Sequence, residues 1–254
     1  MGTDLATGVA PYLAALISIE ATNTFDTGVA LSIIVLSASL NLIGTKVLGK
    51  MTELGVWAGL VGLVVCGGYR LCFARHQPFS VWFESCGAGA GHRTGAMMAA
   101  SLLGIWIFFG HEACGDLAEE VHDASREVPR AMLTTMLAGG GSALLIALGT
   151  ILAVPDMAGA VSGAVSNPAD AALRAAIGPV GATAMLGCLM LVAFSATISV
   201  IASTSRLLFS MGRDRVIPFS VAMSRVNPRT GLPMAAVLAA TVLPCVVLLV
   251  GGFA

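Results

Sequence analysis

The segment Thr94–Arg130 carries the residues of this chain best suited to chemistry. It starts as an apolar stretch and is then interrupted by Gly110, His111 and Glu112. A carboxylate in such a stretch is costly unless it is protonated, paired or in contact with water. The pattern predicts a discontinuous helix whose freed N–H and C=O groups bind a substrate's charged ends. The alternative is a helix that ends at Phe109, with Glu112 among the headgroups.

Motifs for catalysis or metal binding are absent from the sequence. It contains no HExxH, no GxSxG and no aspartate-rich diphosphate motif, and its six cysteines show no CxxC spacing. His111-Glu112 and His122-Asp123 are the only tight pairs of titratable residues that would suit an active site. We therefore expect no enzyme, no metal ion and no cofactor.

The composition is that of a membrane protein. Hydrophobic residues make up 57% of the chain, charged residues make up 11%, and the mean hydropathy is +0.90. A soluble domain has about 25% charged residues, so lipid is the expected covering of this surface. The net charge of −1 gives no indication of nucleic-acid binding.

Charge-free intervals predict where the chain crosses the membrane, because each crossing helix needs roughly 20 apolar residues. The predicted spans are Thr27–Thr45, Leu54–Tyr69 with a start near Met51, Thr94–His111, Ala131–Pro155, Ala175–Ser205 and Thr230–Ala254. One more apolar interval, Val9–Ile19, is too short to cross the membrane alone and has the pattern of the end of a helix.

Lysine and arginine are unevenly distributed over the loops between these spans. One alternating set of loops holds nine and the other holds four, which places the first set in the cytoplasm. The first set is Lys46, Lys50, Arg126, Arg130, Arg206, Arg213, Arg215, Arg225 and Arg229. The second set is Arg70, Arg75, Arg93 and Arg174.

Several segments together resemble the amino acid–polyamine–organocation permeases. WIFFGHE (Trp106–Glu112) is similar to that family's sixth helix, and LAEEVHDASREVPRAM (Leu117–Met132) to the motif that follows it. STSRLLFSMGRDRVIP (Ser203–Pro218) is similar to the end of the eighth helix. LNLIGTKVLGKM (Leu40–Met51) is similar to the join of helices four and five. The closest branch carries neutral amino acids, 4-aminobutyrate (GABA) and choline.

The resemblance implies an all-α fold, a polytopic transmembrane helical bundle. It would be part of the LeuT-like five-plus-five inverted-repeat transporter fold. Residues 1–254 would form a single transmembrane permease domain, from about helix three to helix nine, that lacks the family's first helices.

The resemblance also implies a substrate site at the interruption. Trp106 would close over the substrate, with Phe109 beside it, while Gly110 and His111 lend backbone to the pocket. Glu112 would couple proton movement to substrate movement, since a carboxyl group in a partly dry site has a raised pKa and can exchange a proton. The alternatives are a packing tryptophan, a packed histidine and a carboxyl group that stays protonated in a structural hydrogen bond.

Charged residues at the predicted cytoplasmic face are candidates for an inner gate of acid–base pairs. The alternative is that they are solvated loop charges. These residues are Glu119, Glu120, Arg126, Arg206 and Arg213.

Two further positions bear on the coupling ion. Sodium-coupled relatives place ion ligands on the eighth helix, where this chain has hydroxyl groups, but such hydroxyls usually bond their own backbone. Many proton-coupled relatives carry a lysine midway along the fifth helix, where this chain has Gly59. The hydroxyl residues are Thr197, Ser199, Ser203 and Ser205.

The predicted function is that of a secondary active transporter in the plasma membrane. It would move an amino acid, GABA, choline or a polyamine by alternating access, with proton coupling or exchange. The first alternative is a transport-inactive fragment, or a subunit whose partner chain supplies the missing helices. A membrane-embedded enzyme is a remote alternative.

Overall fold

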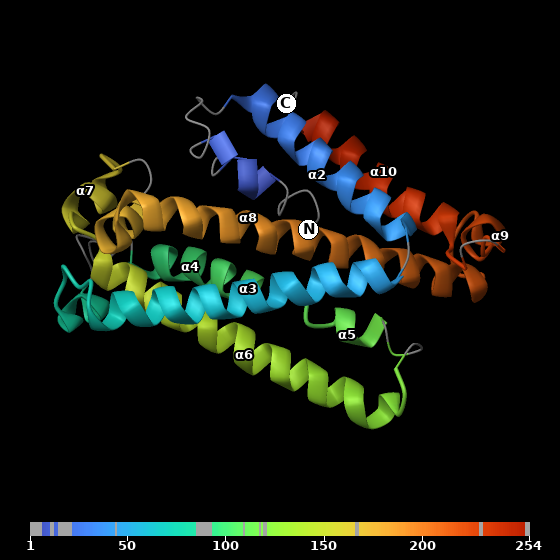
Figure 1. Ribbon diagram of the computed structural model, residues 1–254, viewed down its shortest axis with the longest axis horizontal. Helices are drawn as coiled ribbons and strands as arrows, with labels where there is room; N and C mark the ends of the chain where they lie inside the picture. The colour runs from blue at the N-terminus through green and yellow to red at the C-terminus, as the bar shows by residue number, and fades with distance from the viewer. Residues whose placement is uncertain are drawn as a thin grey trace. The chain divides into compact units, whose positions relative to one another are not determined.

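The computed structural model describes residues 7–10, 13–14, 22–43, 45–84, 93–108, 110–116, 118, 121–165, 168–228 and 231–251. Every regular element in these ranges is a helix and none is a strand (Figure 1), which confirms the predicted all-α fold. The long helices are α2 (Asn23–Ile43), α3 (Thr45–Cys72), α6 (Ala124–Ala153), α8 (Pro168–Arg213) and α10 (Met234–Gly251). The shorter ones are η1 (Phe79–Phe83), α4 (Arg93–Ile107), α5 (Ala113–Asp116), α7 (Met157–Ser162) and α9 (Ser220–Met223).

Within the described part of the chain, five helices are long and apolar enough to cross a membrane: α2, α3, α6, α8 and α10. They coincide with five of the six predicted spans and extend beyond most of the charge-free intervals. α6, for example, begins at Ala124 and not at Ala131, because charged residues are good helix formers outside the hydrocarbon. The protein is therefore an integral, multi-pass membrane protein.

The sixth predicted span, Thr94–His111, is not one continuous helix. α4 has 15 residues, so it is about 22 Å long at 1.5 Å per residue. The hydrocarbon core is about 30 Å thick. α4 alone is therefore shorter than a full crossing, and the helix is interrupted at Gly110. The shorter interval Val9–Ile19 lies mostly outside the described residues.

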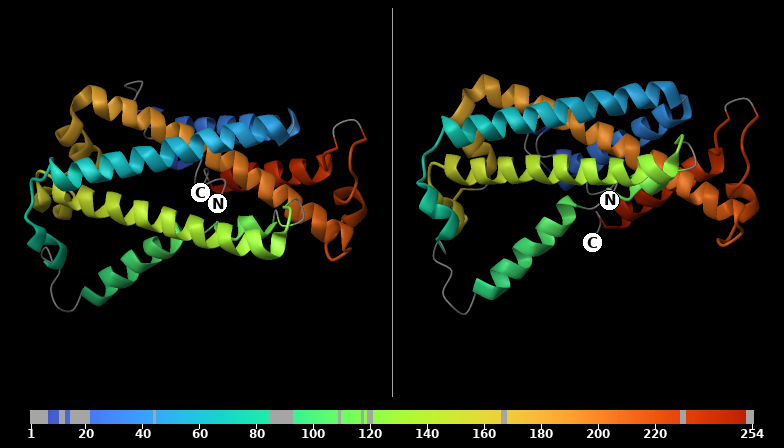
Figure 2. Two further views of the ribbon diagram at one scale, coloured as in Figure 1. Left: turned by 60° about the horizontal axis from the view of Figure 1, so that its bottom comes forward. Right: turned by 90° about the horizontal axis from the view of Figure 1, so that it is seen from below.

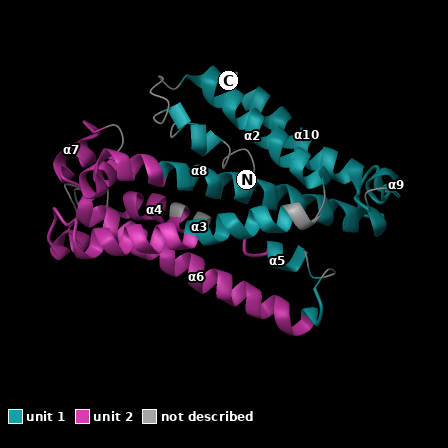
Figure 3. Ribbon diagram, viewed as in Figure 1, with its two compact units in different colours: residues 1–59, 113–124, 186–254 teal, residues 60–112, 125–185 magenta. Residues whose placement is uncertain are grey.

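The chain forms two compact units (Figure 3). Unit 1 comprises residues 1–59, 113–124 and 186–254, and unit 2 comprises residues 60–112 and 125–185. Helices α3 and α8 each contribute to both units. Along the chain, one boundary between the units falls directly after Glu112.

In unit 1, α2 and α10 pack side by side with α8 (Figure 1). Their shared core consists of small and aliphatic side chains, which allow helices in lipid to approach closely. Asn41 fastens α2 to α8, because its side-chain amide donates to the carbonyl groups of Ser37 (2.9 Å) and Ile198 (3.2 Å). The buried core residues are Ala30, Ile34, Ala38, Ile201, Val237, Ala240 and Leu248.

Also in unit 1, α3 meets α8 along two glycines spaced by four residues. A Cβ atom on Gly55 would overlap the side chain of Ser195, and one on Gly59 would lie 3.1 Å from Cγ2 of Val192. The Ser195 hydroxyl donates to the carbonyl of Met51 across this contact (3.1 Å). This spacing of small residues is the usual means by which membrane helices come close together.

In unit 2, α3 and α6 cross at a second glycine pair (Figure 2, where α3 is cyan and α6 yellow-green). A Cβ atom on Gly149 would lie 2.7 Å from the carbonyl oxygen of Gly67 and 3.2 Å from Cβ of Arg70. Arg70 is 4% exposed, and its Nη1 donates to the Thr150 hydroxyl at 2.6 Å. The crossing thus combines backbone contact with a buried polar pair.

The unusually long α8 is two helices joined at a kink within unit 2. Gly178 has φ 71° and ψ 174°, which an L-residue with a side chain rarely adopts, and Pro179 follows it directly. Proline is favoured at the first position of a helix, since it has no N–H to leave unpaired there. The crossing helix therefore begins at Pro179.

Candidate functional site

The predicted interruption of the helix is present in unit 2. α4 ends at Ile107, the N–H of Phe108 donates to the carbonyl of Ile105 (3.0 Å), and the chain then turns through Gly110. Gly110 has φ 100°, a conformation that glycine adopts at no steric cost. The short helix α5 begins three residues later, at Ala113.

Glu112 closes this turn through its side chain. Its Oε2 accepts a hydrogen bond from the backbone N–H of Gly110 at 2.8 Å, while the side chain as a whole is exposed. The carboxylate thus pairs the backbone N–H of Gly110, which lies beyond the C-terminal end of α4 and outside its hydrogen-bond ladder. A hydrogen bond to a charged acceptor is about twice as strong as one between neutral groups. The hydrogen bond that closes the turn is therefore stronger when Glu112 is ionised than when it is neutral.

His111 points back along α4 and towards α6. Its Nδ1 lies 3.0 Å from the carbonyl oxygen of Phe108, an arrangement that requires the proton to be on Nδ1, because a carbonyl only accepts. The His111 and Phe108 rings lie 6.1 Å apart between centroids. The Nε2 atom is 3.7 Å from the position of a Cβ on Gly139. The histidine therefore lies beside Gly139 of α6.

The Phe108 ring packs against Gly140 of α6. A Cβ atom on Gly140 would lie 2.7 Å from Cε1 and 2.9 Å from Cζ of that ring, whereas a Cβ on Gly141 would meet open space. We expect Gly140→Val to displace the ring and to cost about 1 kcal/mol of stability relative to Gly141→Val, the low end for overpacking, because the ring is 46% exposed and its far end can move. Thermal unfolding of both variants in the same detergent measures the difference. Equal unfolding temperatures would show that the Phe108 ring does not pack against Gly140.

The remaining predicted site residues are only partly placed. Trp106 lies in the last turn of α4. Phe109, Glu119 and Glu120 fall outside the described residues. Of the predicted gate arginines, Arg126 and Arg213 are exposed, and Arg206 is half-buried. The Nε atom of Arg213 lies 3.8 Å from the carboxylate of Asp214.

The four hydroxyl groups of α8 divide into two kinds. Thr197 and Ser205 donate to carbonyl groups of their own helix, at Ala193 and Ala202, both at 2.8 Å. Ser199 also donates to a carbonyl of its own helix, that of Ser195 (3.0 Å), and lies 3.4 Å from the hydroxyl of Thr52 on α3. The Ser203 hydroxyl forms a hydrogen bond with another element, and its partner was missed at the sequence level.

That partner is Asp116, at the end of α5. Its Oδ2 accepts a hydrogen bond from Ser203, a contact that lies wholly within unit 1. Asp116 is four residues after Glu112 in the sequence, in the short helix that follows the interruption. A second carboxylate so close to the interruption was the signal that could have identified it.

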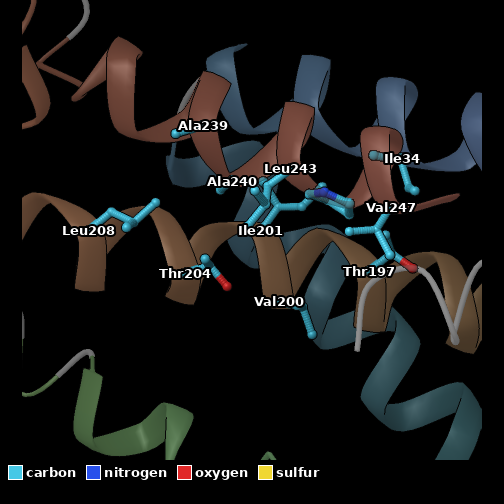
Figure 4. A pocket seen from close by; sticks show the side chains of 11 residues that line it. Ile34, Thr197, Val200, Ile201, Thr204, Leu208, Ala239, Ala240, Leu243 and Val247 are labelled. Atoms are coloured by element: carbon cyan, nitrogen blue, oxygen red, sulfur yellow. The ribbon is translucent and has the colours of Figure 1, made fainter. Parts of the chain in front are cut away.

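Unit 1 contains an apolar cavity of about 350 Å³ between α2, α8 and α10 (Figure 4). Ile34, Leu208 and Leu243 are among the side chains that line it, and Thr197 and Thr204 add hydroxyl groups. None of the predicted substrate residues that the structure describes lines this cavity. An amino acid has two charged ends, which a lining of this kind would leave unpaired at high cost.

No three His, Cys, Asp or Glu side chains in the described ranges are placed to hold a metal ion. The candidate site therefore consists of an interrupted helix, a carboxylate bound to its backbone and an aromatic–histidine pair packed on α6.

Comparison with known proteins assigns the family. The sequence profile described as "Amino acid permease" matches residues 4–254. The choline transporter of Saccharomyces cerevisiae is 28% identical over 130 residues, which cover 51% of this chain and 23% of the relative. An uncharacterized amino-acid permease of Schizosaccharomyces pombe is 33% identical over 149 residues, 57% of this chain and 25% of the relative. A second one from the same yeast is 24% identical over 228 residues, 85% of this chain and 41% of the relative.

The chain thus spans roughly a quarter to two-fifths of the length of these curated relatives. Several are named as transporters or permeases, which points to a transporter and not to an enzyme. With a family match over nearly the whole sequence, and a helical structure that carries the predicted interruption, this protein belongs to the amino acid permease family.

Proposed function

We propose that the protein is part of a secondary active transporter that moves an amino acid or a related amine by alternating access. The observation that carries this proposal is the turn at Gly110, where a helix of a membrane protein is interrupted and a carboxylate binds a backbone N–H of the turn. Transporters place substrates and coupling ions at such interruptions, because the backbone there has unused donors and acceptors.

In this proposal Glu112 couples a proton to the movement of substrate. When the carboxylate takes up a proton, its bond to the Gly110 N–H loses the contribution of the charge. The turn is then free to change shape, and the N–H becomes available to a substrate carboxylate. The reverse step, loss of the proton on the inner side, would re-form the turn after the substrate has left.

An amine substrate fits the same residues. A cationic group is attracted by the exposed Glu112 carboxylate before that group takes up its proton. It is also attracted by the face of an aromatic ring, and Trp106 is the candidate for that ring. One relative is named as a choline transporter, and choline carries a quaternary ammonium. Amino acids, GABA and polyamines each carry a protonated amine, which is also cationic. His111, with its Nδ1 bonded to Phe108, would hold the pocket wall.

The gate is the second part of the proposal. Arg126, Arg206 and Arg213 would pair with Glu119 and Glu120 when the pathway is closed to the cytoplasm, and the plasma membrane is the expected location. By resemblance, Gly59 is the nearest equivalent of the family's helix-five lysine, and a Cβ there would lie 3.1 Å from Cγ2 of Val192. The lack of a lysine at this position weakens the assignment of a particular coupling ion.

Uptake of radiolabelled amino acids, GABA, choline and polyamines into vesicles that carry the chain tests the proposal. We expect accumulation of at least one of them, chemically unchanged and increased by an inward proton gradient. Chemical conversion of the label would support an enzyme. Absence of uptake for every compound, with the protein folded in the membrane, would overturn autonomous transport in favour of a partner chain that supplies further helices.

A further inference from the structure

Two motifs that are separated by more than 150 residues in the sequence meet at one cavity of unit 1. The cavity has a volume of about 230 Å³. Asn41 and Leu48 line it from the α2–α3 segment, and Ser205, Arg206 and Phe209 line it from α8. Both segments are among those by which the sequence resembles the permease family. With the exception of Arg206, these residues have no part in the proposed transport cycle.

The polar groups of this cavity are complementary to a ligand with both an anionic group and hydrogen-bond donors. The side-chain amide of Asn41 already donates to Ser37 and Ile198, so only its Oδ1 is left, as an acceptor. The Ser205 hydroxyl donates to Ala202, which likewise leaves acceptor capacity. Arg206 supplies positive charge. Its guanidinium has five N–H donors, so an interaction within the protein still leaves donors for a ligand.

The rest of the cavity wall is apolar and preformed. Phe209, Leu232 and Val237 contribute hydrophobic surface. The loop before α10 is closed by backbone hydrogen bonds: the N–H of Asn227 donates to Leu232 (3.0 Å), and the N–H of Gly231 donates to Asn227 (2.8 Å). Gly231 has φ 68°, which suits this tight turn. The ligand therefore has an apolar part beside its polar one.

The cavity lies where apolar helices give way to loops. α2 ends two residues after Asn41, α3 begins three residues before Leu48, and α10 begins next to Pro233. This is the side that the distribution of lysine and arginine assigns to the cytoplasm. Exposed basic residues of the same unit, Lys50 and Arg225, add to the positive charge on this side. Basic pockets between membrane helices on the cytoplasmic side are suited to anionic lipid headgroups.

We propose that this cavity binds the headgroup of an anionic aminophospholipid from the inner leaflet. Arg206 holds the phosphate, Asn41 Oδ1 and Ser205 Oγ accept from the ammonium, and Phe209 with Leu232 contacts the glycerol and the start of an acyl chain. None of the predicted substrate residues within the described ranges lines this cavity, so the proposal does not depend on transport.

Binding of short-chain phosphatidylserine to the purified full chain in detergent tests this site. Phosphatidylcholine and inorganic phosphate serve as comparison probes, because the first has no N–H donors and no net charge and the second has no apolar part. We expect saturable phosphatidylserine binding. Arg206→Gln should weaken it about tenfold, through loss of a charge-assisted contact. Arg213→Gln, the same change on the same helix outside the cavity, should alter it by less than about twofold.

Val226→Asp is a second variant for the case in which Arg206→Gln does not fold. Val226 lines the cavity and is 45% exposed, so the added carboxylate leaves the core intact and repels the phosphate. Weaker phosphatidylserine binding by either variant supports the site. Unchanged binding by a folded variant overturns it. Equal binding of phosphatidylcholine overturns headgroup recognition, and equal binding of inorganic phosphate overturns the assignment to a lipid.

Discussion

Glu112→Gln is expected to abolish the pH dependence of uptake while leaving the protein folded and in the membrane. The amide oxygen of glutamine can still accept from the Gly110 N–H, but without the contribution of a charge, as in the protonated form of Glu112. The amide cannot take up a proton, so the step that makes uptake faster at acidic external pH is lost. We expect uptake at the acidic optimum to fall about tenfold, the effect of losing one charge-assisted interaction.

Two variants separate coupling from structure in this test. Glu112→Ala removes both the proton site and the bond to Gly110, so it should lower uptake at every pH and loosen the turn. Glu127→Gln is the matched control, since Glu127 is an exposed carboxylate of the same unit that lies 3.5 Å from Arg130. It should leave the pH profile unchanged. A Glu112→Gln protein whose uptake keeps the wild-type pH profile would rule out the coupling role.

Gly149→Val is expected to be the most destabilising single substitution at the crossing of α3 and α6. The added Cβ would lie 2.7 Å from the carbonyl oxygen of Gly67, which is backbone and cannot rotate away. The two helices would have to separate, and that would also pull Thr150 from the buried Arg70 side chain. We expect a loss of about 3 kcal/mol or more, the upper range for overpacking together with a buried polar group that loses its partner.

Gly141→Val is the matched control for this substitution. It makes the same chemical change in the same helix, with the same effect on helix propensity, at a position where a Cβ meets open space. Thermal unfolding in detergent, followed by size-exclusion chromatography of the heated samples, measures both variants. Indistinguishable unfolding temperatures would mean that α3 and α6 do not cross at Gly149.

The positions of the long helices were predictable because the bilayer acts on the sequence locally. Within hydrocarbon, every backbone N–H and C=O must be paired inside the segment, so a sufficiently long apolar run becomes a helix whatever its neighbours are. α10 and α2 match their charge-free intervals closely for this reason. α6 and α8 were predicted too short, since charged residues in their end turns continue the helix where water is available.

The interruption at Gly110 was predictable for the same reason, whereas its partners were not. A carboxylate that follows a glycine at the end of an apolar run indicates a break without knowledge of the fold. That the carboxylate binds the Gly110 N–H, two residues away, depends on a positive φ that glycine permits but does not require. That Phe108 lies on Gly140 depends on how the chain returns along α6.

By itself, then, the sequence determined the class of protein, the approximate positions of its helices and the place where one of them breaks, because apolar length and isolated charge act within a single segment. Only the tertiary structure decided that Asp116 binds Ser203, that Gly149 meets Gly67, and that Asn41 and Arg206 line one cavity. Each of these contacts joins residues more than 80 positions apart. Such pairs are selected by close packing of helix surfaces, where the presence or absence of a single Cβ sets the distance between two backbones.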